Sequence, residues 1–302
     1  MTPVANILFA SSILALRLSS LRAVASSPPR SFSSSRPSPE PLQRSSRFAG
    51  KTFIVTGGTS GVGENIALQL AAEGAGGVSV VGRNSTRGAG VVAKLEGLGC
   101  PGLFIKASMD DVAQVSDVVP KHEARFGVAH GLVNSAGDTS RGWLKDQSVE
   151  SWDRLFAVNA RAPFILTQAA TNSMIEAGVR GAVVNIITIT SHGGQPYLCG
   201  YAASKGALAT FTKNAAHQLR RSRIRCNGIN IGWTASAAEH RLQVEETGDE
   251  DWLEKAGEKV PFGRLVETGD ISELACFLLS ERSGVCTGSV IDFDQMVMGG
   301  YD

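Results

Sequence analysis

The sequence predicts a single α/β domain built on a doubly wound, mainly parallel β-sheet. From Lys51 onward, short runs rich in β-branched residues alternate with longer stretches of helical period. No Pro/Ser-rich break, low-complexity stretch or internal repeat interrupts residues 51–302, which fits one domain better than two. The 34 glycines against 11 prolines indicate the many tight turns that an alternating α/β chain needs.

Seven runs have the composition of buried strands: Thr52–Thr56, Val78–Val81, Gly102–Ile105, Gly131–Asn134, Val183–Thr188, Arg225–Ile229 and Ser289–Phe293. Between them lie stretches of helical period, namely Val62–Glu73, Val112–Arg125, Trp152–Glu176, Tyr201–Arg221 and Ile271–Ser280. This alternation implies parallel βαβ units, hence about seven parallel strands with helices on both faces. Ligands of such sheets bind beyond the carboxyl ends of the strands.

Residues 1–50 differ in composition from the rest of the chain. They hold six arginines and 13 serines but a single acidic residue, Glu40. An Arg-rich, Ser-rich and acid-poor segment is typical of a transit peptide, so we predict import into mitochondria, or into plastids. The alternatives are a secretory signal cleaved near Ala23-Val24-Ala25 and a disordered tail with no targeting function. We expect none of these 50 residues to belong to the folded domain.

Charge and cysteine usage exclude several classes of function. A net charge of +1 provides no positive field to hold a nucleic acid. The sequence contains no run of 18 or more apolar residues, so it predicts no membrane-spanning helix. The five cysteines are scattered without a C-x-x-C pair, and the histidines do not cluster, so we expect a reducing compartment and no metal site.

A glycine-rich turn follows the first predicted strand and opens a predicted helix, in the order Thr56-Gly57-Gly58-Thr59-Ser60-Gly61-Val62-Gly63. Glycines in such a turn let backbone N–H groups approach a pyrophosphate, and the helix N-terminus adds positive potential. The spacing G-x-x-x-G-x-G differs from the common Rossmann-type G-x-G-x-x-G, and a plain tight turn is the alternative. The residues that we expect to contact a dinucleotide here are Gly57, Thr59, Ser60, Gly61, Val62 and Gly63.

Arg83 follows the second predicted strand, twenty residues after Gly63. An acidic residue at this place would bind an adenosine 2′-hydroxyl, whereas an arginine would bind a 2′-phosphate. The acid is missing and the arginine is present, so NADP is favoured over NAD. A solvated loop arginine is the alternative.

Tyr201 and Lys205 lie four residues apart at the start of a predicted helix, so both side chains lie on one face of it. A lysine ammonium near a phenol stabilises the phenolate and lowers its pKa toward the range of a general acid/base. A chance pair on a helix is the alternative. The strand Val183–Thr188 ends 13 residues before Tyr201. The Thr188 hydroxyl therefore lies at the carboxyl end of a strand, where the ligand cleft is expected.

Together these motifs resemble the short-chain dehydrogenase/reductase family over residues 51 to about 300. The turn TGGTSGVG resembles the family's cofactor turn, and Asn134-Ser135-Ala136-Gly137 resembles its NNAG motif. Asn159 matches its helix asparagine, and Tyr201 with Lys205 matches its YxxxK pair. The resemblance implies a single Rossmann-type domain and an oxidoreductase that interconverts a secondary alcohol and a carbonyl. With Arg83, the expected cofactor is NADP(H).

The resemblance also implies a role for each matching residue. Tyr201 would exchange a proton with the substrate oxygen, while Lys205 would lower the tyrosine's pKa and hold the nicotinamide ribose. Asn159 would order a water relay. Thr188, where the family usually has serine, would hydrogen-bond the developing oxyanion, with Ser191 as the alternative. Further cofactor contacts are expected from Ser108, Met109, Asn134, Ala136, Gly137, Gly232 and Thr234.

Several positions depart from the family pattern. Ser108 stands where an aspartate often lies near the adenine, which weakens that contact unless Asp110 replaces it. Ile231-Gly232 replaces a common Pro-Gly, and Gln295-Met296 replaces a late glycine pair. These departures indicate a divergent subgroup, whose substrate need not be that of the commonest members.

Substrate contacts are expected from residues 192–199 and from a lid formed by residues 233–262. Residues 239–258 hold eight carboxylates against two basic side chains, which would repel an anionic partner if the acids point inward. Hydrogen-bonding and aromatic side chains in both segments favour a small neutral polyol or sugar. An organellar 3-oxoacyl-thioester reductase and a weakly active NADP-binding regulatory protein are the alternatives. The resemblance implies a homodimer or homotetramer.

Overall fold

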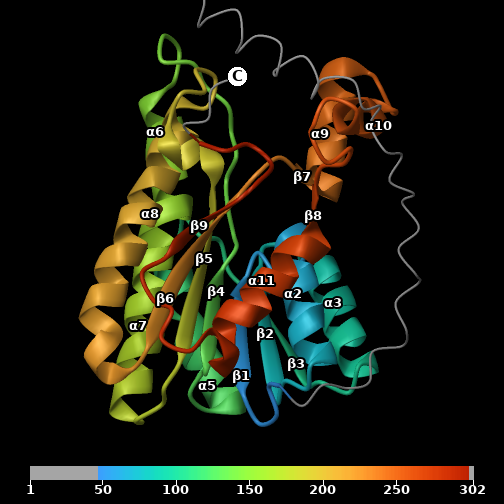
Figure 1. Ribbon diagram of the computed structural model, residues 1–302. Helices are drawn as coiled ribbons and strands as arrows, with labels where there is room; N and C mark the ends of the chain where they lie inside the picture. Colours follow the sequence, from blue (N-terminus) through green and yellow to red (C-terminus); the bar gives the residue numbers. More distant parts are fainter. Residues whose placement is uncertain (1–46, 299–302) are drawn as a thin grey trace, which may run out of the picture. The chain divides into compact units, whose positions relative to one another are not determined.

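The computed structural model describes residues 47–298, which contain a seven-stranded parallel sheet (Figure 1). Its strands are β1 (Thr52–Thr56), β2 (Gly77–Gly82), β3 (Gly102–Lys106), β4 (Gly131–Asn134), β5 (Ala182–Thr188), β6 (Arg225–Ile231) and β9 (Val290–Phe293). Their order is β3-β2-β1-β4-β5-β6-β9, and all neighbours pair in parallel. The predicted fold class and strand number are confirmed.

The strand order reverses direction between β1 and β4. The chain builds outward from β1 to β3, then returns to place β4 on the other side of β1. Thr56 at the end of β1 pairs in register with Asn134 at the end of β4. Such a switch point is where ligands bind in doubly wound sheets, because the crossover connections leave in opposite directions and open a crevice.

Helices cover both faces of the sheet (Figure 1). They are α2 (Gly61–Ala72), α3 (Ser85–Gly97), α4 (Val112–Ser116), α5 (Val118–Phe126), α6 (Val149–Phe156), α7 (Ala162–Glu176), α8 (Cys199–Leu219) and α11 (Thr268–Leu279). Alternate residues of β1 point to opposite faces: Phe53 and Val55 pack with α2, α3 and α11, whereas Ile54 packs with α4, α5, α7 and α8. The two-sided burial explains why the central strands are almost continuously apolar.

The folded domain begins before Lys51, contrary to the expectation that it excludes residues 1–50. Phe48 is fully buried in the core, where its ring meets Phe53 edge-to-face at a centroid distance of 5.0 Å. Its N–H donates to the Glu73 carbonyl, and Arg47 forms an ion pair with the Glu73 carboxylate at 3.0 Å. The sequence did not reveal the buried Phe48, because the residues before it are rich in serine and arginine. The rest of the predicted targeting segment, residues 1–46, lies outside the described residues.

Several predicted helices differ in detail. The helix predicted for Val112–Arg125 divides at Asp117 into α4 and α5. The one predicted for Trp152–Glu176 consists of α6 and α7 joined by a π-helical turn, Ala157–Arg161, which carries Asn159. Helix α3 was not predicted, because Gly88, Gly90 and Gly97 lower its helix propensity; a Cβ at Gly88 would meet the Phe104 ring, so this glycine permits the helix to pack on β3.

The segment after β6 forms a small substructure of its own. Strands β7 (Thr234–Ala235) and β8 (Val266–Glu267) pair in parallel, and helices α9 (Ala237–Thr247) and α10 (Trp252–Gly257) lie between them in the chain. Trp252, Ala256 and Leu265 form a separate buried cluster. Figure 1 shows α9 and α10 set apart from the layered part of the domain, as expected of a lid.

Candidate active site

Thr56 joins the ends of the two strands at the switch point. Its Oγ1 accepts hydrogen bonds from the backbone N–H groups of Ser135 and Ala136, both at 3.1 Å. Gly57 has φ +64°, and a Cβ there would lie 2.9 Å from the Ala136 backbone. The turn after β1 and the loop after β4 therefore pack backbone against backbone, which only glycine permits at this position.

The rest of the turn has the shape of a dinucleotide cradle. A Cβ at Gly63 would lie 2.5 Å from the Gly57 carbonyl oxygen, so this glycine lets α2 begin directly against the strand. Gly61 has φ +58°, and Ser60 precedes α2 in extended conformation without its side chain capping the helix. The first N–H groups of α2, including that of Val62, face the switch point as a pyrophosphate requires. The residues present thus fit the nucleotide that the sequence predicts.

Arg83 lies beside this turn. A Cβ at Gly82 would touch the Thr59 side chain at 2.8 Å, which places the end of β2 against the turn, and Arg83 is the exposed residue that follows. Lys106, at the end of β3, pairs in register with Gly82 and is also exposed. Within residues 47–298, neither basic side chain has a hydrogen bond or ion pair. Lys106 was missed from the sequence, because only sheet register brings it next to Arg83.

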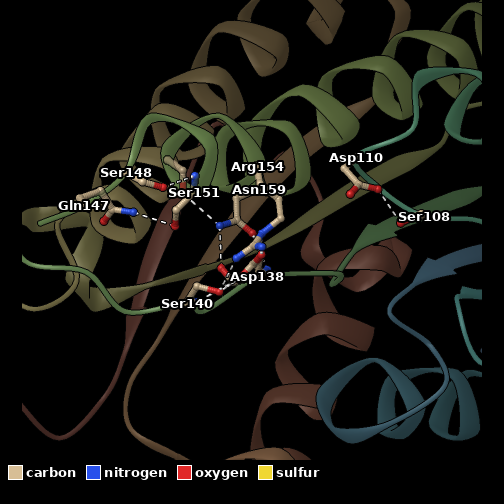
Figure 2. Close-up of polar contacts among 10 residues, drawn as sticks. Ser108, Asp110, Asp138, Ser140, Gln147, Ser148, Ser151, Arg154 and Asn159 are labelled. Carbon is tan, nitrogen blue, oxygen red and sulfur yellow. Dashed lines mark hydrogen bonds and ion pairs between the residues drawn. The ribbon is translucent and has the colours of Figure 1, made fainter.

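The segment after β3 is held by its own polar side chains. Ser108 Oγ donates to Asp110 Oδ1 at 2.5 Å, and the Ser108 N–H donates to Gln114. Asp110 therefore does approach Ser108, and Figure 2 shows the pair. Met109, between them, is buried.

The Asn134 side chain is buried and hydrogen-bonded to neighbouring elements of the fold. Its Nδ2 donates to Asn185 Oδ1 at 2.8 Å and to Thr167 at 3.2 Å, and Asn185 in turn donates to Thr212. These four residues form a buried polar chain from α7 to α8 through β4 and β5. The Asn134 Nδ2 is thus engaged within the protein, whereas its Oδ1 has no hydrogen-bond partner among residues 47–298.

Thr188 and Tyr201 meet at the other side of the switch point. Thr188 is the last residue of β5 and Tyr201 lies in the first turn of α8, and the Thr188 side chain is near enough to the phenol to lower its pKa. Ser191 instead donates to Asn230 at 3.2 Å. Thr188 therefore affects the pKa of Tyr201, whereas the Ser191 hydroxyl is engaged with Asn230.

Burial, together with the charge of Glu239, raises the pKa of Tyr201 to about 12, although the nearby Thr188 side chain acts in the opposite direction. This rise is opposite to the shift predicted from the sequence. The Lys205 ammonium donates to the Ile186 carbonyl at 2.8 Å, and burial lowers the pKa of Lys205 to about 8. In this pocket, loss of solvation outweighs the effect expected of Lys205 on the tyrosine.

Asn159 lies on the same side, fully buried in the π-helical turn. Its Oδ1 accepts from the Asp138 N–H at 2.9 Å, and its Nδ2 donates to the Asp138 carbonyl at 2.9 Å and to Ser204 Oγ at 3.0 Å. A Cβ at Gly137 would lie 3.5 Å from Asn159 Oδ1 and 3.7 Å from Lys205 Nζ. The structure thus gathers the loop after β4, Asn159 and the Tyr201–Lys205 helix around one point.

Gly232 and Thr234 connect β6 to the lid. Gly232 leaves room for the Asp294 side chain, and Thr234 donates to the Gly232 carbonyl at 2.9 Å. In the lid, Glu239 Oε1 accepts from Trp233 Nε1 and from Gln243 Nε2, both at 2.8 Å. The sequence shows that the lid is acidic but does not single out Glu239, because the effect of this charge on the pKa of Tyr201 depends on how α9 packs.

Comparison with known proteins identifies the family. A family model described as enoyl-(acyl carrier protein) reductase matches residues 57–301. A (3R)-3-hydroxyacyl-CoA dehydrogenase from Mus musculus is 31% identical over 257 residues, which cover 82% of this chain and 95% of that protein. The chain belongs to the short-chain dehydrogenase/reductase family. As a short-chain dehydrogenase/reductase, it is an NAD(P)-dependent oxidoreductase of alcohol and carbonyl groups.

Other members of the short-chain dehydrogenase/reductase family align over similar lengths. A 3-oxoacyl-[acyl-carrier-protein] reductase from Thermotoga maritima is 31% identical, with 82% of this chain and 98% of that protein covered. The structure of L-sorbose reductase from Gluconobacter frateurii, complexed with NADPH and L-sorbose, matches with a TM-score of 0.78 at 26% identity, covering 84% of this chain and 98% of that one.

Two further observations concern residues 47–298 alone. No helix there is both long and apolar enough to cross a membrane. The same part of the chain contains no group of three or more His, Cys, Asp or Glu side chains arranged to hold a metal ion.

Proposed function

We propose that this short-chain dehydrogenase/reductase is an NADP(H)-dependent enzyme that interconverts a secondary alcohol and a carbonyl on a small, neutral, polar substrate. The observation that carries the proposal is the placement of Thr188 at the end of β5 beside Tyr201 in the first turn of α8, with Lys205 one helical turn further on and bound to the Ile186 carbonyl of β5. It joins an acid group and a second hydroxyl donor where a substrate oxygen could meet both.

A bound nicotinamide would supply the hydride in this reaction. In the direction of reduction, Tyr201 gives its proton to the substrate oxygen while the Thr188 hydroxyl donates to the same oxygen as charge develops on it. A tyrosine pKa of about 12 keeps the phenol protonated at neutral pH, which suits the role of acid. The Lys205 ammonium, held by the Ile186 carbonyl, stabilises the resulting phenolate.

The preference for NADP rests on Arg83 and Lys106. Both side chains are exposed beyond the carboxyl ends of neighbouring strands. A guanidinium binds a phosphate through two parallel hydrogen bonds, and an ammonium nearby adds a second positive charge. A 2′-phosphate would therefore be bound there, whereas a 2′-hydroxyl would leave both charges without a counterpart.

Glu239 supports a substrate that offers hydroxyl groups. Trp233 and Gln243 both bind its Oε1, and its Oε2 has no hydrogen-bond partner among residues 47–298. Its charge contributes to the raised pKa of Tyr201, so we expect the same charge to act on a molecule bound at the phenol. A carboxylate here accepts hydrogen bonds from a polyol or sugar and repels an anionic group.

A 3-oxoacyl thioester is a second candidate substrate. The relatives from Mus musculus and Thermotoga maritima favour it, because their names specify hydroxyacyl-CoA and 3-oxoacyl-[acyl-carrier-protein]. The reaction at the carbonyl would be the same. The two candidates differ in what lies beyond it, a hydroxylated chain in one and a long anionic carrier in the other.

Turnover by the full chain tests the proposal. NADPH oxidation is followed by absorbance with ketoses, neutral ketones and acetoacetyl thioesters, each at equal concentration. We expect NADPH turnover with a ketose and a loss of about 10³-fold or more in Tyr201→Phe, whose fold should be intact. Turnover with acetoacetyl thioesters alone would select the second candidate, and absence of turnover with every substrate would contradict both.

The role of Glu239 is tested with Glu239→Gln, which keeps the shape and removes the charge. We expect KM for a ketose to rise by about fivefold and KM for a keto acid of equal length to fall. Glu245→Gln, an exposed residue of the same helix, is the matched control. An equal change with both substrates would show that the charge plays no part in selection.

Mitochondrial delivery and self-association complete the proposal. Residues 1–50 fused to a fluorescent protein should direct it to mitochondria, and replacing all six arginines with glutamine should abolish this import.

The exposed Phe164 ring on α7 meets Phe211 of α8 at a centroid distance of 5.9 Å, which offers an apolar face for a second copy. Light scattering of the full chain should give a dimer or tetramer mass.

A further inference from the structure

Asp138 and Arg154 form an ion pair directly beside the Asn159 amide (Figure 2). Arg154 Nε lies 2.8 Å from Asp138 Oδ2, and Arg154 Nη2 donates to Ser140 Oγ at 3.0 Å. Asp138 Oδ1 accepts from the Ser140 N–H at 2.9 Å and from the Ser140 hydroxyl at 2.5 Å. Both carboxylate oxygens are thus fixed, one by the loop itself and one by helix α6.

These contacts close a ring. Arg154 lies in α6, which continues into the π-helical turn and so carries Asn159. The Asn159 side chain then binds both the N–H and the C=O of Asp138, and the Asp138 carboxylate returns to Arg154. One residue is therefore held by its backbone and its side chain to two successive turns of the same helical segment.

We propose that Asp138 and Arg154 are positioning residues that orient the Asn159 amide and the Gly137 backbone against Lys205. The inference rests on the proposed function only in assigning Tyr201 and Lys205 to catalysis. Asn159 Nδ2 also donates to Ser204, the neighbour of Lys205, and Gly137 precedes Asp138. A displacement of the loop after β4 by one ångström would break both Asn159–Asp138 hydrogen bonds and move Gly137 relative to the ammonium.

Charge and exposure favour positioning over a contribution to stability. Burial opposes ionisation of Asp138, but hydrogen bonds from Ser140 and the charge of Arg154 outweigh it, so the pKa of Asp138 is lowered. The Arg154 side chain is 50% exposed and that of Asp138 20%. A partly solvated ion pair adds little to the free energy of folding, yet it fixes a geometry.

The test uses the full chain with Asp138→Asn, Arg154→Met and Arg154→Lys. Asp138→Asn keeps the shape and the acceptor for Ser140 but loses the charge. We expect Asp138→Asn and Arg154→Met to lower kcat by about tenfold and to shift its pH profile, with KM changed less than twofold. Arg154→Lys should recover most of kcat. Asp117→Asn, which breaks the exposed Lys121–Asp117 pair on α5, should leave kcat unchanged.

A second readout does not depend on turnover. Amide hydrogen exchange at residue 138, measured by NMR, should accelerate by about tenfold in Arg154→Met and return toward the parent rate in Arg154→Lys. If the parent chain reduces no substrate, the proposed function fails. The exchange rate still tests whether Arg154 holds the Asp138 loop against Asn159. Unchanged exchange, an unchanged kcat and pH profile in an active parent, or a loss of kcat that merely follows a lower melting temperature would overturn the proposal.

Discussion

The Thr188 side chain at the end of β5 faces Tyr201 in the first turn of α8 and lowers the pKa of its phenol. Thr188 is buried, and its Oγ1 accepts from the Thr190 N–H at 3.3 Å. The Thr190 hydroxyl donates to the same atom at 3.4 Å, so Thr190 fixes the Thr188 rotamer. A threonine can serve where the family usually has serine, because its hydroxyl is held toward the phenol while its methyl group has one defined place.

Removal of this hydroxyl should impair catalysis selectively. Thr188→Val keeps the shape of the side chain but not the donor, and we expect kcat to fall by about 100-fold, as for loss of one oxyanion donor. Thr188→Ser should stay within about threefold of the parent, since the donor remains. Steady-state kinetics with the best substrate measure both. Ser191→Ala, which loses only a contact to Asn230, is the control, and a larger effect there than in Thr188→Val would reverse the assignment.

Arg83 should discriminate between the two nicotinamide cofactors. Loss of a charge-assisted contact to a phosphate in Arg83→Ala should weaken NADPH binding by about 10- to 100-fold and leave NADH binding almost unchanged. Lys106→Ala should have a smaller effect in the same direction. Fluorescence titration of the full chain gives both dissociation constants. Arg180→Ala, an exposed residue before the start of β5 and so at the opposite end of the sheet, should affect neither, and an equal loss for NADPH and NADH in Arg83→Ala would refute phosphate recognition.

Gly57 should tolerate no side chain. Gly57→Ala places a Cβ 2.9 Å from the Ala136 backbone at φ +64°, so the turn must move away from the loop after β4. We expect nucleotide binding to weaken by about tenfold or more and stability to fall by about 1–3 kcal/mol. Calorimetry and titration measure the two effects. Gly90→Ala in α3 has no atom within 4 Å of the new Cβ and should instead stabilise by up to about 1 kcal/mol.

The elements that the sequence predicted well are those encoded by local spacing. The turn from Thr56 to Gly63 has its glycines at the positions where strand, turn and helix require them, and Tyr201 with Lys205 needs only one helical turn to share a face. The seven strands were identified because burial on both faces leaves continuous apolar runs.

The features that the sequence could not reveal depend on distant segments. Asp138 and Arg154 come together only because the loop after β4 folds back on α6, and the charge of Glu239 affects the pKa of Tyr201 only through the packing of the lid. The direction of the Tyr201 pKa shift also depends on burial, which a four-residue spacing does not express.

Phe48 should contribute to stability although it precedes the predicted start of the domain. Its ring is fully buried against Phe53. Phe48→Ala should lower the free energy of unfolding by about 3–5 kcal/mol, the usual cost of removing a buried ring. Urea denaturation measures this value. Phe262→Ala, at a side chain that is 79% exposed, should change it by less than about 0.5 kcal/mol, whereas equal effects of the two variants would mean that residue 48 is not part of the core.

His122 should make the fold sensitive to mild acid. The ring is fully buried, with Nδ1 2.7 Å from Ser79 Oγ and Nε2 3.3 Å from Thr52 Oγ1. Burial, with a smaller effect of His130, lowers the pKa of His122 to about 4 from its ordinary value of 6.5. Below pH 6.5 the unfolded chain therefore binds a proton that the folded chain does not, and stability falls as the pH decreases.

Between pH 7 and pH 5 this one histidine should cost about 2 kcal/mol. Urea denaturation of the parent and of His122→Gln at both pH values isolates its share. The variant should be less stable at pH 7, because it disturbs a buried hydrogen-bonded site, but its stability should decrease less toward pH 5. His217→Gln, at an exposed position of α8, should retain the parent's pH dependence. Equal losses in the parent and in His122→Gln would show that other groups cause the acid sensitivity.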